Sequence, residues 1–570
     1  MRYFALATDY DGTLAADGRV TKDTLTALKQ LRASGRKLIL VTGRELDDLL
    51  QVFEQIDLFD YVVAENGALL YCPASRQEKL LGEPAPTEFI KALRDRQVNP
   101  LSVGRVIVAT WHPQETAVLE TIRDLGLELQ VIFNKGAVMV LPSGINKAAG
   151  LAAALDEMKL SPHNVVGVGD AENDHAFLSV CECSVAVANA LPMLKERVDF
   201  VTDSSRGDGV IELIDKLIAS DLSELDEQLQ RHNILLGTKK DNSEVNIQPS
   251  GSSILLAGTS GGGKSTLATA VLERIAEQKY QFCIIDPEGD YENFEGAVVL
   301  GDAERSPRLT EVLDLLEKPY ENVVVNLLGI AVEDRPAFFA ELLPALLELR
   351  SRTGRPHWIV VDEAHHLMPA SWNPASLTLP QQLEGMMLIT VHPDRVAAAG
   401  LSLINTIVTV GNSPQENIKA FCEALGDCPP QIAPQTLETG EALAWFRGKQ
   451  TEPFCFRIAP GHRERRRHAR KYAEGELGED KSFYFQGSQG KLNLRAQNLI
   501  LFIQIAEGVD DETWLYHLQR GDYSRWFRQA IKDESLAEEA EEIEQNNRTS
   551  AHESRDAIKG AIAQHYTLPA

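Results

Sequence analysis

Short apolar runs alternate with amphipathic stretches along the first 220 residues of the chain. The runs at 4–8, 38–41 and 165–168 are largely apolar, the last two with several β-branched side chains, and apolar positions with helical spacing occupy 21–33. Buried strands that alternate with amphipathic helices are typical of a parallel sheet with helices on both faces. We therefore expect residues 1–220 to form a doubly wound α/β domain.

The pattern changes between about residues 84 and 145. It predicts a helix at 87–96, a strand at 103–110, a helix at 115–125 and two strands that end at 141. An α+β segment of this kind, placed between two parts of a parallel sheet, is expected to form a small inserted unit.

A polar, turn-rich segment at 221–250 follows, and its composition is typical of a linker between domains. The alternation then resumes, with apolar runs of strand length that predict a second doubly wound parallel sheet over 251–475. Beyond residue 475, apolar residues recur every three or four positions, which predicts a helical module at 476–570. Trp514 and Trp526 are the expected anchors of its core.

The composition agrees with a folded chain of several domains, since 570 residues exceed the roughly 150 of one domain, and 44% are hydrophobic and 24% charged. With 56 Lys and Arg against 83 Asp and Glu, the net charge is −27, which argues against a surface that binds nucleic acid or anionic membranes as a whole. A local basic channel stays open as an alternative.

The amino terminus has no export signal, and no run approaches the ~20 apolar residues of a membrane span. The seven cysteines lack paired spacing, so we expect reduced thiols and no cysteine zinc site. These features predict a cytoplasmic protein without a membrane partner.

Four short motifs follow one another within the first 180 residues, three of them directly after predicted strands. The carboxyl ends of parallel strands lie at one edge of a sheet, where open α/β domains bind their ligands. The motifs are Asp9-Tyr10-Asp11-Gly12-Thr13, Thr42-Gly43-Arg44, Gly144-Ile145-Asn146-Lys147 and Gly169-Asp170-Ala171-Glu172-Asn173-Asp174.

This order of motifs resembles the haloacid dehalogenase (HAD) superfamily, in its Cof-type branch (HAD-IIB), over about residues 1–215. The resemblance implies that Asp9 is a nucleophile that forms an aspartyl-phosphate, and that Asp11 protonates the leaving oxygen and then activates water. A carboxylate can attack a phosphoryl group only when a cation cancels their repulsion, so Mg²⁺ is the implied cofactor. The other implied roles are Mg²⁺ binding by Asp9, Asp11, Asp170 and Asp174, phosphate binding by Thr42 and Lys147, and orientation of the phosphate or a metal ligand by Asn173.

The inserted unit corresponds to the cap that this branch carries between its second and third motifs. Because the unit is small, the resemblance implies an open site and a small phosphorylated substrate, such as a sugar phosphate or a phosphoglycolate-like acid. Arg105, Trp111 and His112 are candidates to contact it, although packing or a solvated surface is the more frequent role of such side chains.

A second phosphate-binding motif begins at Gly258. It follows the apolar run 254–257 and opens a helix, which is the structural context of a P-loop. Backbone N–H groups and the helix N-terminus bind the phosphates of ATP there, Lys264 reaches the outer phosphates, and Ser265 supplies a hydroxyl for Mg²⁺. The expected nucleotide-binding residues are Gly258, Gly261, Gly262, Gly263, Lys264, Ser265 and Thr266.

An acid pair follows the apolar run 358–361. Asp362 is expected in the magnesium shell, and Glu363 is expected to polarise the attacking water, which is the arrangement that hydrolyses ATP. The segment 362–365 reads DEAH, as in helicases, but we find no other helicase motif with it.

The second half resembles the HerA/FtsK-type motor ATPases from about residue 234 to 475. The resemblance implies a ring-shaped homo-oligomer, usually a hexamer, in which a neighbouring subunit supplies an arginine to each site. The matching segments are 235–237, 284–291, 362–365 and 466–475.

The sensor strand departs from this resemblance. His392 stands near its end where relatives often have glutamine, so γ-phosphate sensing by His392 stays open. Arg395 and Arg447 are candidate arginine fingers, although an ordinary surface position is the more frequent role of such residues.

The densest basic run lies at 463–471 and includes five arginines and a lysine. In a ring it could face DNA or a neighbouring subunit, whereas a solvated helix face is the alternative that we favour. No aromatic platform accompanies the run, so we expect weak DNA binding at most.

The leading hypothesis is a bifunctional protein, a Mg²⁺-dependent HAD phosphatase joined to a HerA/FtsK-type ATPase. A polynucleotide kinase-phosphatase is the first alternative, because Asp286 lies where such a kinase could hold its base. A scaffold that assembles on ATP and carries a regulatory phosphatase is the second.

Overall fold

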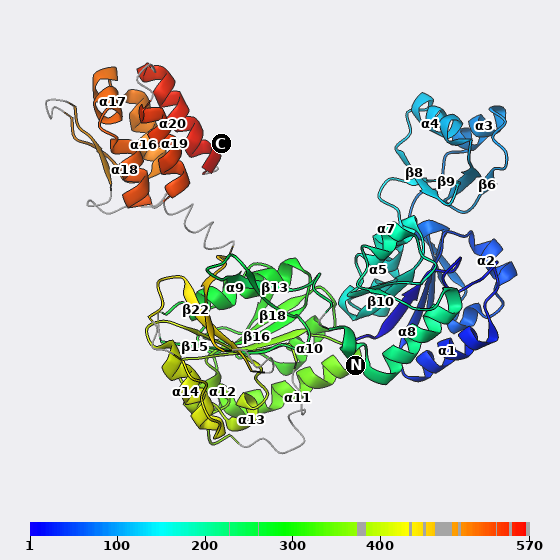
Figure 1. The fold of residues 1–570 in the computed structure, drawn as a ribbon, viewed down its shortest axis with the longest axis horizontal. Coiled ribbons are helices and arrows are strands. Elements are labelled where there is room, and N and C mark those ends of the chain that lie inside the picture. Colours follow the sequence, from blue (N-terminus) through cyan, green and yellow to red (C-terminus); the bar gives the residue numbers. More distant parts are fainter. Residues whose placement is uncertain are drawn as a thin grey trace. The chain divides into compact units, whose positions relative to one another are not determined.

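A computed structural model gives the fold of the chain (Figure 1). It separates into two compact units, residues 1–459 and 460–570, which are described one at a time. The structure describes residues 1–226, 228–259, 262–372, 384–432, 436–447, 452–461, 482–487, 492–531, 533–545 and 550–565.

The first domain, residues 1–229, is built on an eight-stranded sheet in the order β12-β11-β10-β1-β2-β3-β4-β5. Neighbours from β12 to β3 are parallel, whereas β4 and β5 pair antiparallel at one edge, so the sheet is mixed rather than wholly parallel. The strands are β1 (Ala5–Thr8), β2 (Lys37–Val41), β3 (Tyr61–Ala64), β4 (Leu69–Cys72), β5 (Gln77–Leu80), β10 (Val165–Gly169), β11 (Cys183–Ala186) and β12 (Phe200–Val201).

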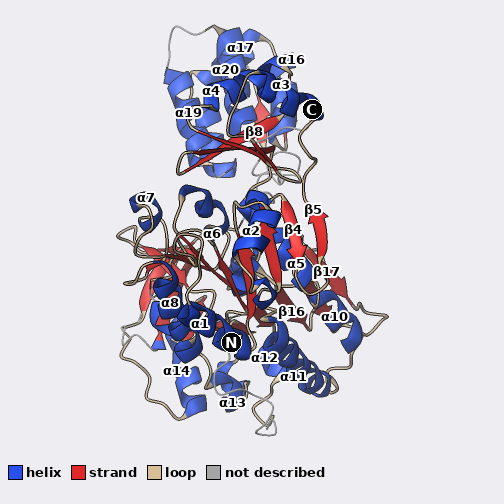
Figure 2. Cartoon of the chain, turned by 90° about the vertical axis from the view of Figure 1, so that its right-hand side faces the viewer, coloured by secondary structure: helices blue, strands red, loops and turns tan. Residues whose placement is uncertain are grey.

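Helices cover both faces of this sheet, as Figures 1 and 2 show, with α1 and α8 side by side on one face and α5 on the other. The central strands are buried from end to end, which explains their continuous apolar sequence. The helices are α1 (Lys22–Ala33), α2 (Leu46–Val52), α5 (Lys147–Met158), α6 (His175–Leu178), α7 (Pro192–Lys195) and α8 (Arg206–Ser220), with short 3-10 turns at η1 (Ile56–Leu58), η2 (Glu65–Gly67), η3 (Pro162–Asn164), η4 (Glu172–Asp174) and η5 (Ser223–Leu225).

The inserted unit forms a separate four-stranded antiparallel sheet, β6-β7-β9-β8, with two helices against it. Phe89, Leu93 and Val118 of the helices pack on Val108 and Val140 of the strands. The elements are α3 (Thr87–Asp95), β6 (Ser102–Val103), β7 (Val108–Trp111), α4 (Glu115–Asp124), β8 (Leu129–Asn134) and β9 (Ala137–Pro142).

Part of the expected linker 221–250 belongs to the second domain instead. Residues 234–247 form a hairpin, β13 (Ile234–Thr238) and β14 (Glu244–Ile247), at the edge of the second sheet. Alternate apolar side chains of the hairpin, including Ile234 and Ile247, are buried, and the polar residues that suggested a linker make its turn. Only about four residues, 230–233, connect the domains.

The second domain, residues 234–459, contains an eleven-stranded sheet in the order β14-β13-β23-β22-β21-β15-β20-β19-β16-β18-β17. The strands from β21 to β17 are parallel, and the other four add antiparallel to one side. The further strands are β15 (Ser253–Gly258), β16 (Phe282–Asp286), β17 (Ala297–Leu300), β18 (Asn322–Asn326), β19 (Trp358–Val361), β20 (Met386–Thr390), β21 (Thr406–Val410), β22 (Glu441–Phe446) and β23 (Phe454–Ile458).

Helices pack on both faces of the second sheet as well (Figure 1). Leu267 and Val271 of α9 pack on one face, and Leu342 of α11 and Phe421 of α14 pack on the other. The helices are α9 (Lys264–Glu277), α10 (Leu309–Leu316), α11 (Arg335–Thr353), α12 (Ala364–Leu367), α13 (Ala398–Leu401) and α14 (Pro414–Leu425), with a 3-10 turn at η6 (Pro393–Arg395).

The two domains of the first unit touch through residues that precede their strands. Arg355 Nη2 donates to the Lys159 carbonyl at 2.7 Å, and the Tyr280 hydroxyl donates to Glu182 Oε2 at 2.7 Å. Glu182 lies just before β11, Tyr280 just before β16 and Arg355 just before β19. The carboxyl ends of these strands therefore point away from the contact.

The second unit has its own aromatic core, in which Trp514 and Tyr523 stack with ring centroids 4.4 Å apart and Trp526 packs nearby. Within the described part of the chain, no helix combines the length and apolar character needed to cross a membrane. The elements are β24 (Phe483–Phe485), β25 (Leu494–Ala496), α16 (Leu499–Gly508), α17 (Asp511–Leu518), α18 (Asp522–Trp526), the π-helical turn η8 (Phe527–Ile531), α19 (Glu534–Gln545) and α20 (Ala551–His565).

Gly67→Ala tests how tightly η2 packs on the start of α5. Gly67 has φ +105°, and a Cβ there would lie 1.9 Å from the Asn146 carbonyl oxygen, so the substitution forces the backbone to move. We expect a loss of stability about 1–3 kcal/mol larger than for Gly35→Ala, measured as the change in the thermal midpoint. Gly35 has a similar φ of +91° with nothing within 4 Å, so equal losses in the two variants would contradict this packing.

Candidate active sites

A buried lysine joins two carboxylates at the carboxyl edge of the first sheet. Lys147, the first residue of α5, donates to Asp9 Oδ1 and to Asp174 Oδ1, both at 2.6 Å. Asn146 fixes the start of the helix by accepting hydrogen bonds from the next two N–H groups. The Lys147 side chain is only 1% exposed, so this ammonium group depends on its two anionic partners.

Asp170 completes a set of three carboxylates suited to a divalent cation. One oxygen each of Asp9, Asp170 and Asp174 lies within 4.8 Å of the others. Asp170 Oδ1 is buried without a hydrogen-bond partner among the described residues, while Asp170 Oδ2 accepts from Lys135 of the β8–β9 turn at 2.8 Å. An unpartnered carboxylate oxygen beside two further carboxylates fits Mg²⁺, which prefers oxygen ligands.

The protonation of this set follows from burial and charge. Burial and the neighbouring Asp174 raise the pKa of Asp9 to about 7, although Lys147 opposes the shift. Burial also raises the pKa of Asp170, against the ion pair with Lys135. Burial by itself would lower the pKa of Lys147, but the charges of Asp174 and Asp9 outweigh it and the pKa is raised. A cation at the three carboxylates would favour their ionised forms.

Asp11 does not join the three carboxylates. Its Oδ2 accepts from Arg44 Nε at 2.5 Å and its Oδ1 from Arg44 Nη2 at 2.7 Å, and its side chain is 45% exposed. The motif resemblance implied that Asp11 is a metal ligand. In the structure its carboxylate is bound by Arg44 instead. Thr42, 1% exposed, has the expected place after β2, where its hydroxyl accepts from the Arg44 N–H.

Three further side chains reach this edge: Arg44 of the second motif, and Asn66 and Lys135, which we did not single out. Asn66 in η2 accepts from Asn173 Nδ2 at 3.0 Å. Lys135 comes from the inserted unit and Arg44 from the end of β2. Asn66 could have been found from the sequence, because it lies in a polar run after the strand β3, as the other site residues do after their strands. No local signal marks Lys135.

The cap residues considered from sequence have different surroundings. Arg105 forms ion pairs with Asp47 and Glu78, which engage its guanidinium away from the three carboxylates. His112 lies 2.9 Å from Glu115, and the Trp111 side chain is 54% exposed. Trp111 and His112 thus both present open side chains, since the His112 side chain is 72% exposed.

The P-loop follows β15, which lies between β21 and β20. A Cβ on Gly258 would lie 2.4 Å from the Val410 carbonyl oxygen, so only glycine allows this approach of β15 to β21. Lys264 begins α9 and its Nζ donates to the Thr259 carbonyl at 3.3 Å. Ser265 and Thr266 are exposed, and Gly262 and Gly263 precede the helix, whereas Ser260 and Gly261 lie outside the described residues.

Asp362 and Glu363 stand at the end of β19, one strand removed from the P-loop strand. Burial raises the pKa of Asp362 to about 7. Burial also raises the pKa of Glu363, and Lys264 is the charge that opposes this shift, so the acid pair faces the P-loop lysine. Glu363 Oε2 is buried without a hydrogen-bond partner among the described residues. His365 Nδ1 lies 3.3 Å from it but contacts Thr390 Oγ1 at 3.0 Å instead.

Asp286, the base that a kinase would need, is engaged by the backbone. Its two oxygens accept four N–H groups, from residues 288–291, at 2.8–3.2 Å, and its side chain is fully buried. Burial raises its pKa, and these hydrogen bonds oppose the shift. The carboxylate closes the turn after β16 and is not open to a substrate hydroxyl.

The candidate sensor and the two candidate arginine fingers of the second domain differ in their contacts. Thr390 Oγ1 contacts both His365 Nδ1 and the His392 N–H, so His392 lies beside the acid pair. Arg447 forms an ion pair with Asp427 of its own chain at 2.5 Å, whereas Arg395 is exposed. The basic run 463–471 lies outside the described residues.

Comparison with known proteins gives two family matches. Residues 6–103 and 95–214 match the haloacid dehalogenase-like hydrolases, and residues 236–347 match the central domain of helicase HerA. Both resemblances drawn from the motifs are thereby confirmed.

Individual relatives agree with the first match. A phosphoglycolate phosphatase of Methanothermobacter thermautotrophicus is 31% identical over 219 residues, 37% of this chain and 96% of the relative. Phosphoglycolate phosphatase 2 of Saccharolobus solfataricus is 30% identical over 220 residues, 38% of this chain and 92% of the relative. A solved haloacid dehalogenase-like hydrolase from Bacteroides thetaiotaomicron aligns with 38% of this chain and 99% of its own at 18% identity, with a TM-score of 0.33.

The raised pKa of Asp9 makes a prediction about stability without divalent cations. A carboxyl whose pKa rises from 3.8 to about 7 on folding stabilises the fold when protonated, and this contribution is lost as the pH rises through about 7. We expect the thermal midpoint of the wild type to fall relative to Asp9→Asn between about pH 4 and pH 7, by about 2–4 °C per kcal/mol.

The control variant for this experiment is Asp23→Asn, at an exposed position in the first turn of α1. Its midpoint should run parallel to that of the wild type over the same pH range. A constant difference between the wild type and Asp9→Asn would show that the pKa of Asp9 is not raised.

Proposed function

The chain belongs to the haloacid dehalogenase-like hydrolases through residues 6–214, and from this membership we propose that its first domain is a Mg²⁺-dependent phosphatase of small phosphate monoesters. The observation that carries the proposal is the convergence of Asp9, Asp170 and Asp174 around the buried ammonium of Lys147. Asp9, Asp170 and Asp174 would hold Mg²⁺, whose charge reduces the repulsion between Asp9 and the phosphate.

In the proposed reaction a carboxylate oxygen of Asp9 attacks phosphorus and forms an acyl phosphate, while the bond from phosphorus to the leaving oxygen breaks. Asp11 gives its proton to that oxygen, then takes a proton from the water that hydrolyses the acyl phosphate, which regenerates both side chains. Because Arg44 binds both oxygens of Asp11, this role requires the ion pair to open when substrate is present. Lys147 and Thr42 stabilise the phosphate oxygens.

We propose 2-phosphoglycolate as the substrate class, a small acid that carries a second negative charge. Its support is the activity named for the relatives and the presence of Lys135 from the inserted unit at the carboxylate set. If Mg²⁺ were bound at Asp170, the ammonium of Lys135, which now pairs with Asp170, would be free to bind the substrate carboxylate.

For the second domain we propose ATP hydrolysis. Its support is the match to the HerA central domain together with Lys264 at the start of α9 and the raised pKa of Glu363 near it. The engagement of Asp286 by backbone N–H groups weighs against the polynucleotide kinase. We further propose that the second domain forms a ring, in which the exposed Arg395 is the arginine finger offered to a neighbouring subunit. We also propose a cytoplasmic location, which fits the seven free cysteines.

Two variants separate the activities. Asp9→Asn should lower hydrolysis of 2-phosphoglycolate and of an aryl phosphate on the order of 10³-fold or more, with ATP turnover close to that of the wild type. Lys264→Ala should abolish ATP turnover and leave the phosphatase active. Initial rates of phosphate release with each substrate measure both, and loss of both activities in either variant would contradict separate sites.

Glu363→Gln tests the proposed ATPase itself. Removal of the group that polarises water should lower kcat for ATP by about 100-fold or more, while nucleotide affinity is kept. Rates of phosphate release and the binding of a fluorescent ATP analogue provide the two measurements. Label transfer from ATP to a 5′-hydroxyl oligonucleotide would instead support the kinase, and ATP binding without turnover in the wild type would support the scaffold.

A further inference from the structure

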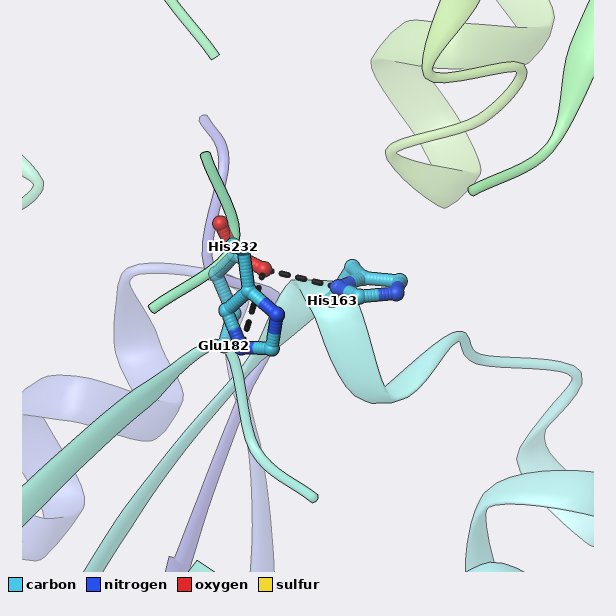
Figure 3. Close-up of side chains that lie close together, drawn as sticks. All are labelled: His163, Glu182 and His232. Carbon is cyan, nitrogen blue, oxygen red and sulfur yellow. Dashed lines mark hydrogen bonds and ion pairs between the residues drawn. The ribbon is translucent and has the colours of Figure 1, made fainter. Parts of the chain in front are cut away.

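Two histidines and a glutamate meet where the two domains of the first unit join. His163 and Glu182 come from the first domain and His232 from the connection 230–233 (Figure 3). One ligand atom of each lies within 4.8 Å of the others, and all three side chains are at least four-fifths buried. None of them takes part in either proposed reaction, since His163 precedes β10 and the three carboxylates lie at the opposite end of that strand.

The hydrogen bonds of His163 define which ring nitrogen carries a lone pair. Nε2 lies 2.6 Å from the Gln278 carbonyl oxygen, which only accepts, so Nε2 carries hydrogen. Nδ1 of the neutral ring then presents a lone pair to Glu182 Oε2, 2.7 Å away. A proton between the two atoms accounts for this distance. A tetrahedral metal ion bound to both would hold them about 3.3 Å apart, so metal binding requires the pair to open by about 0.6 Å.

His232 offers a second nitrogen to the same carboxylate oxygen. Its Nε2 is 3.9 Å from Glu182 Oε2 and is buried without a hydrogen-bond partner among the described residues. A buried nitrogen without a partner is costly unless something binds there.

Neighbouring residues bind His163 and Glu182 through hydrogen bonds of the kind that metal ligands receive from their outer partners. Glu182 Oε1 accepts from Arg2 Nη2 at 2.5 Å, and Oε2 accepts from the Tyr280 hydroxyl at 2.7 Å. The Gln278 carbonyl holds His163 in the same manner. Ligating histidines in proteins donate their other N–H to carbonyls or carboxylates, and ligating carboxylates are themselves hydrogen-bonded.

A route from solvent leads to the cluster. A cavity of about 800 Å³ between the two domains is lined by His163, Glu182 and Tyr280. His357 also lines it, and its buried Nε2 has no hydrogen-bond partner among the described residues, so the wall of the cavity keeps unsatisfied polar atoms.

We propose that His163 Nδ1, His232 Nε2 and Glu182 Oε2 bind one transition-metal dication of the Zn²⁺ class at the joint between the two domains. Two imidazole nitrogens and one carboxylate, with a fourth position open toward the cavity, match the ligand preference of Zn²⁺ and exclude Mg²⁺ as the favoured ion. The site is therefore distinct in chemistry from the all-oxygen set around Asp9. The metal fixes the connection 230–233 against the first domain and so strengthens the joint.

Cobalt provides the test, because its visible absorption is strong in a four-coordinate nitrogen-containing site and weak in a six-coordinate oxygen site. The full-length protein is stripped with a chelator, kept in excess Mg²⁺ to occupy the carboxylate set, and titrated with Co²⁺. We expect one equivalent of Co²⁺ to give the four-coordinate spectrum, and Zn²⁺ to displace it and raise the thermal midpoint.

Three variants accompany the titration. His163→Ala and His232→Ala should each weaken Co²⁺ binding by more than about 100-fold, since loss of an outer partner alone costs about 10–100-fold. His552→Ala, an exposed histidine of the second unit, should bind as the wild type does. A cooperative thermal transition of the metal-free protein shows that each variant is folded.

Two outcomes overturn the proposal. The first is the absence of a four-coordinate Co²⁺ spectrum in the wild type. The cluster would then be an ion pair with a proton between His163 and Glu182, and no variant is needed to show it. The second is a wild-type affinity for Co²⁺ in folded His163→Ala and His232→Ala. Neither outcome depends on the substrate assigned to the first domain.

Discussion

The first active site exists because one buried ammonium group, that of Lys147, balances carboxylates that could not otherwise be buried together. Asp9 and Asp174 are almost fully enclosed, and each lies 2.6 Å from Lys147 Nζ. Without that charge the two carboxylates would repel each other and lose their hydration, and at least one would take up a proton. The same balance leaves one oxygen of Asp170 unpartnered, which is where a divalent cation gains most.

The direction of the strands decides how the two sites relate. The domains of the first unit meet at the amino ends of β11, β16 and β19, whereas each site lies at carboxyl ends. A strand of four to five residues at about 3.3 Å per residue separates each site from the joint. The sites therefore share no side chain, and any coupling between them has to pass through the strands or the joint, where the His163 cluster lies.

Two aspartates on neighbouring strands of the second sheet show how surroundings divide roles within one residue type. Asp286 ends β16 and receives four backbone N–H groups, so its charge is used to close a turn. Asp362 follows β19 and accepts from the Glu363 N–H, which leaves it a pKa of about 7 and capacity to bind a cation. The motif around Asp362 predicted its place in the magnesium shell. The engagement of Asp286 could not be predicted in this way, because hydrogen bonding by the local backbone is set after the chain has folded.

The sequence by itself determined the α/β layering and the strand ends that carry Asp9, Thr42, Asp170 and the P-loop, because buried parallel strands are continuously apolar and the residues after them fall at one edge. It misassigned 234–247, since the turn of a hairpin and a linker have the same polar composition. Only the tertiary structure paired Arg44 with Asp11, brought Lys135 to Asp170, and gathered His163, Glu182 and His232. Most of those contacts join residues that are far apart in the chain, and the contact of Arg44 depends on the direction of its side chain. Neither property leaves a periodic signal in the order of amino acids.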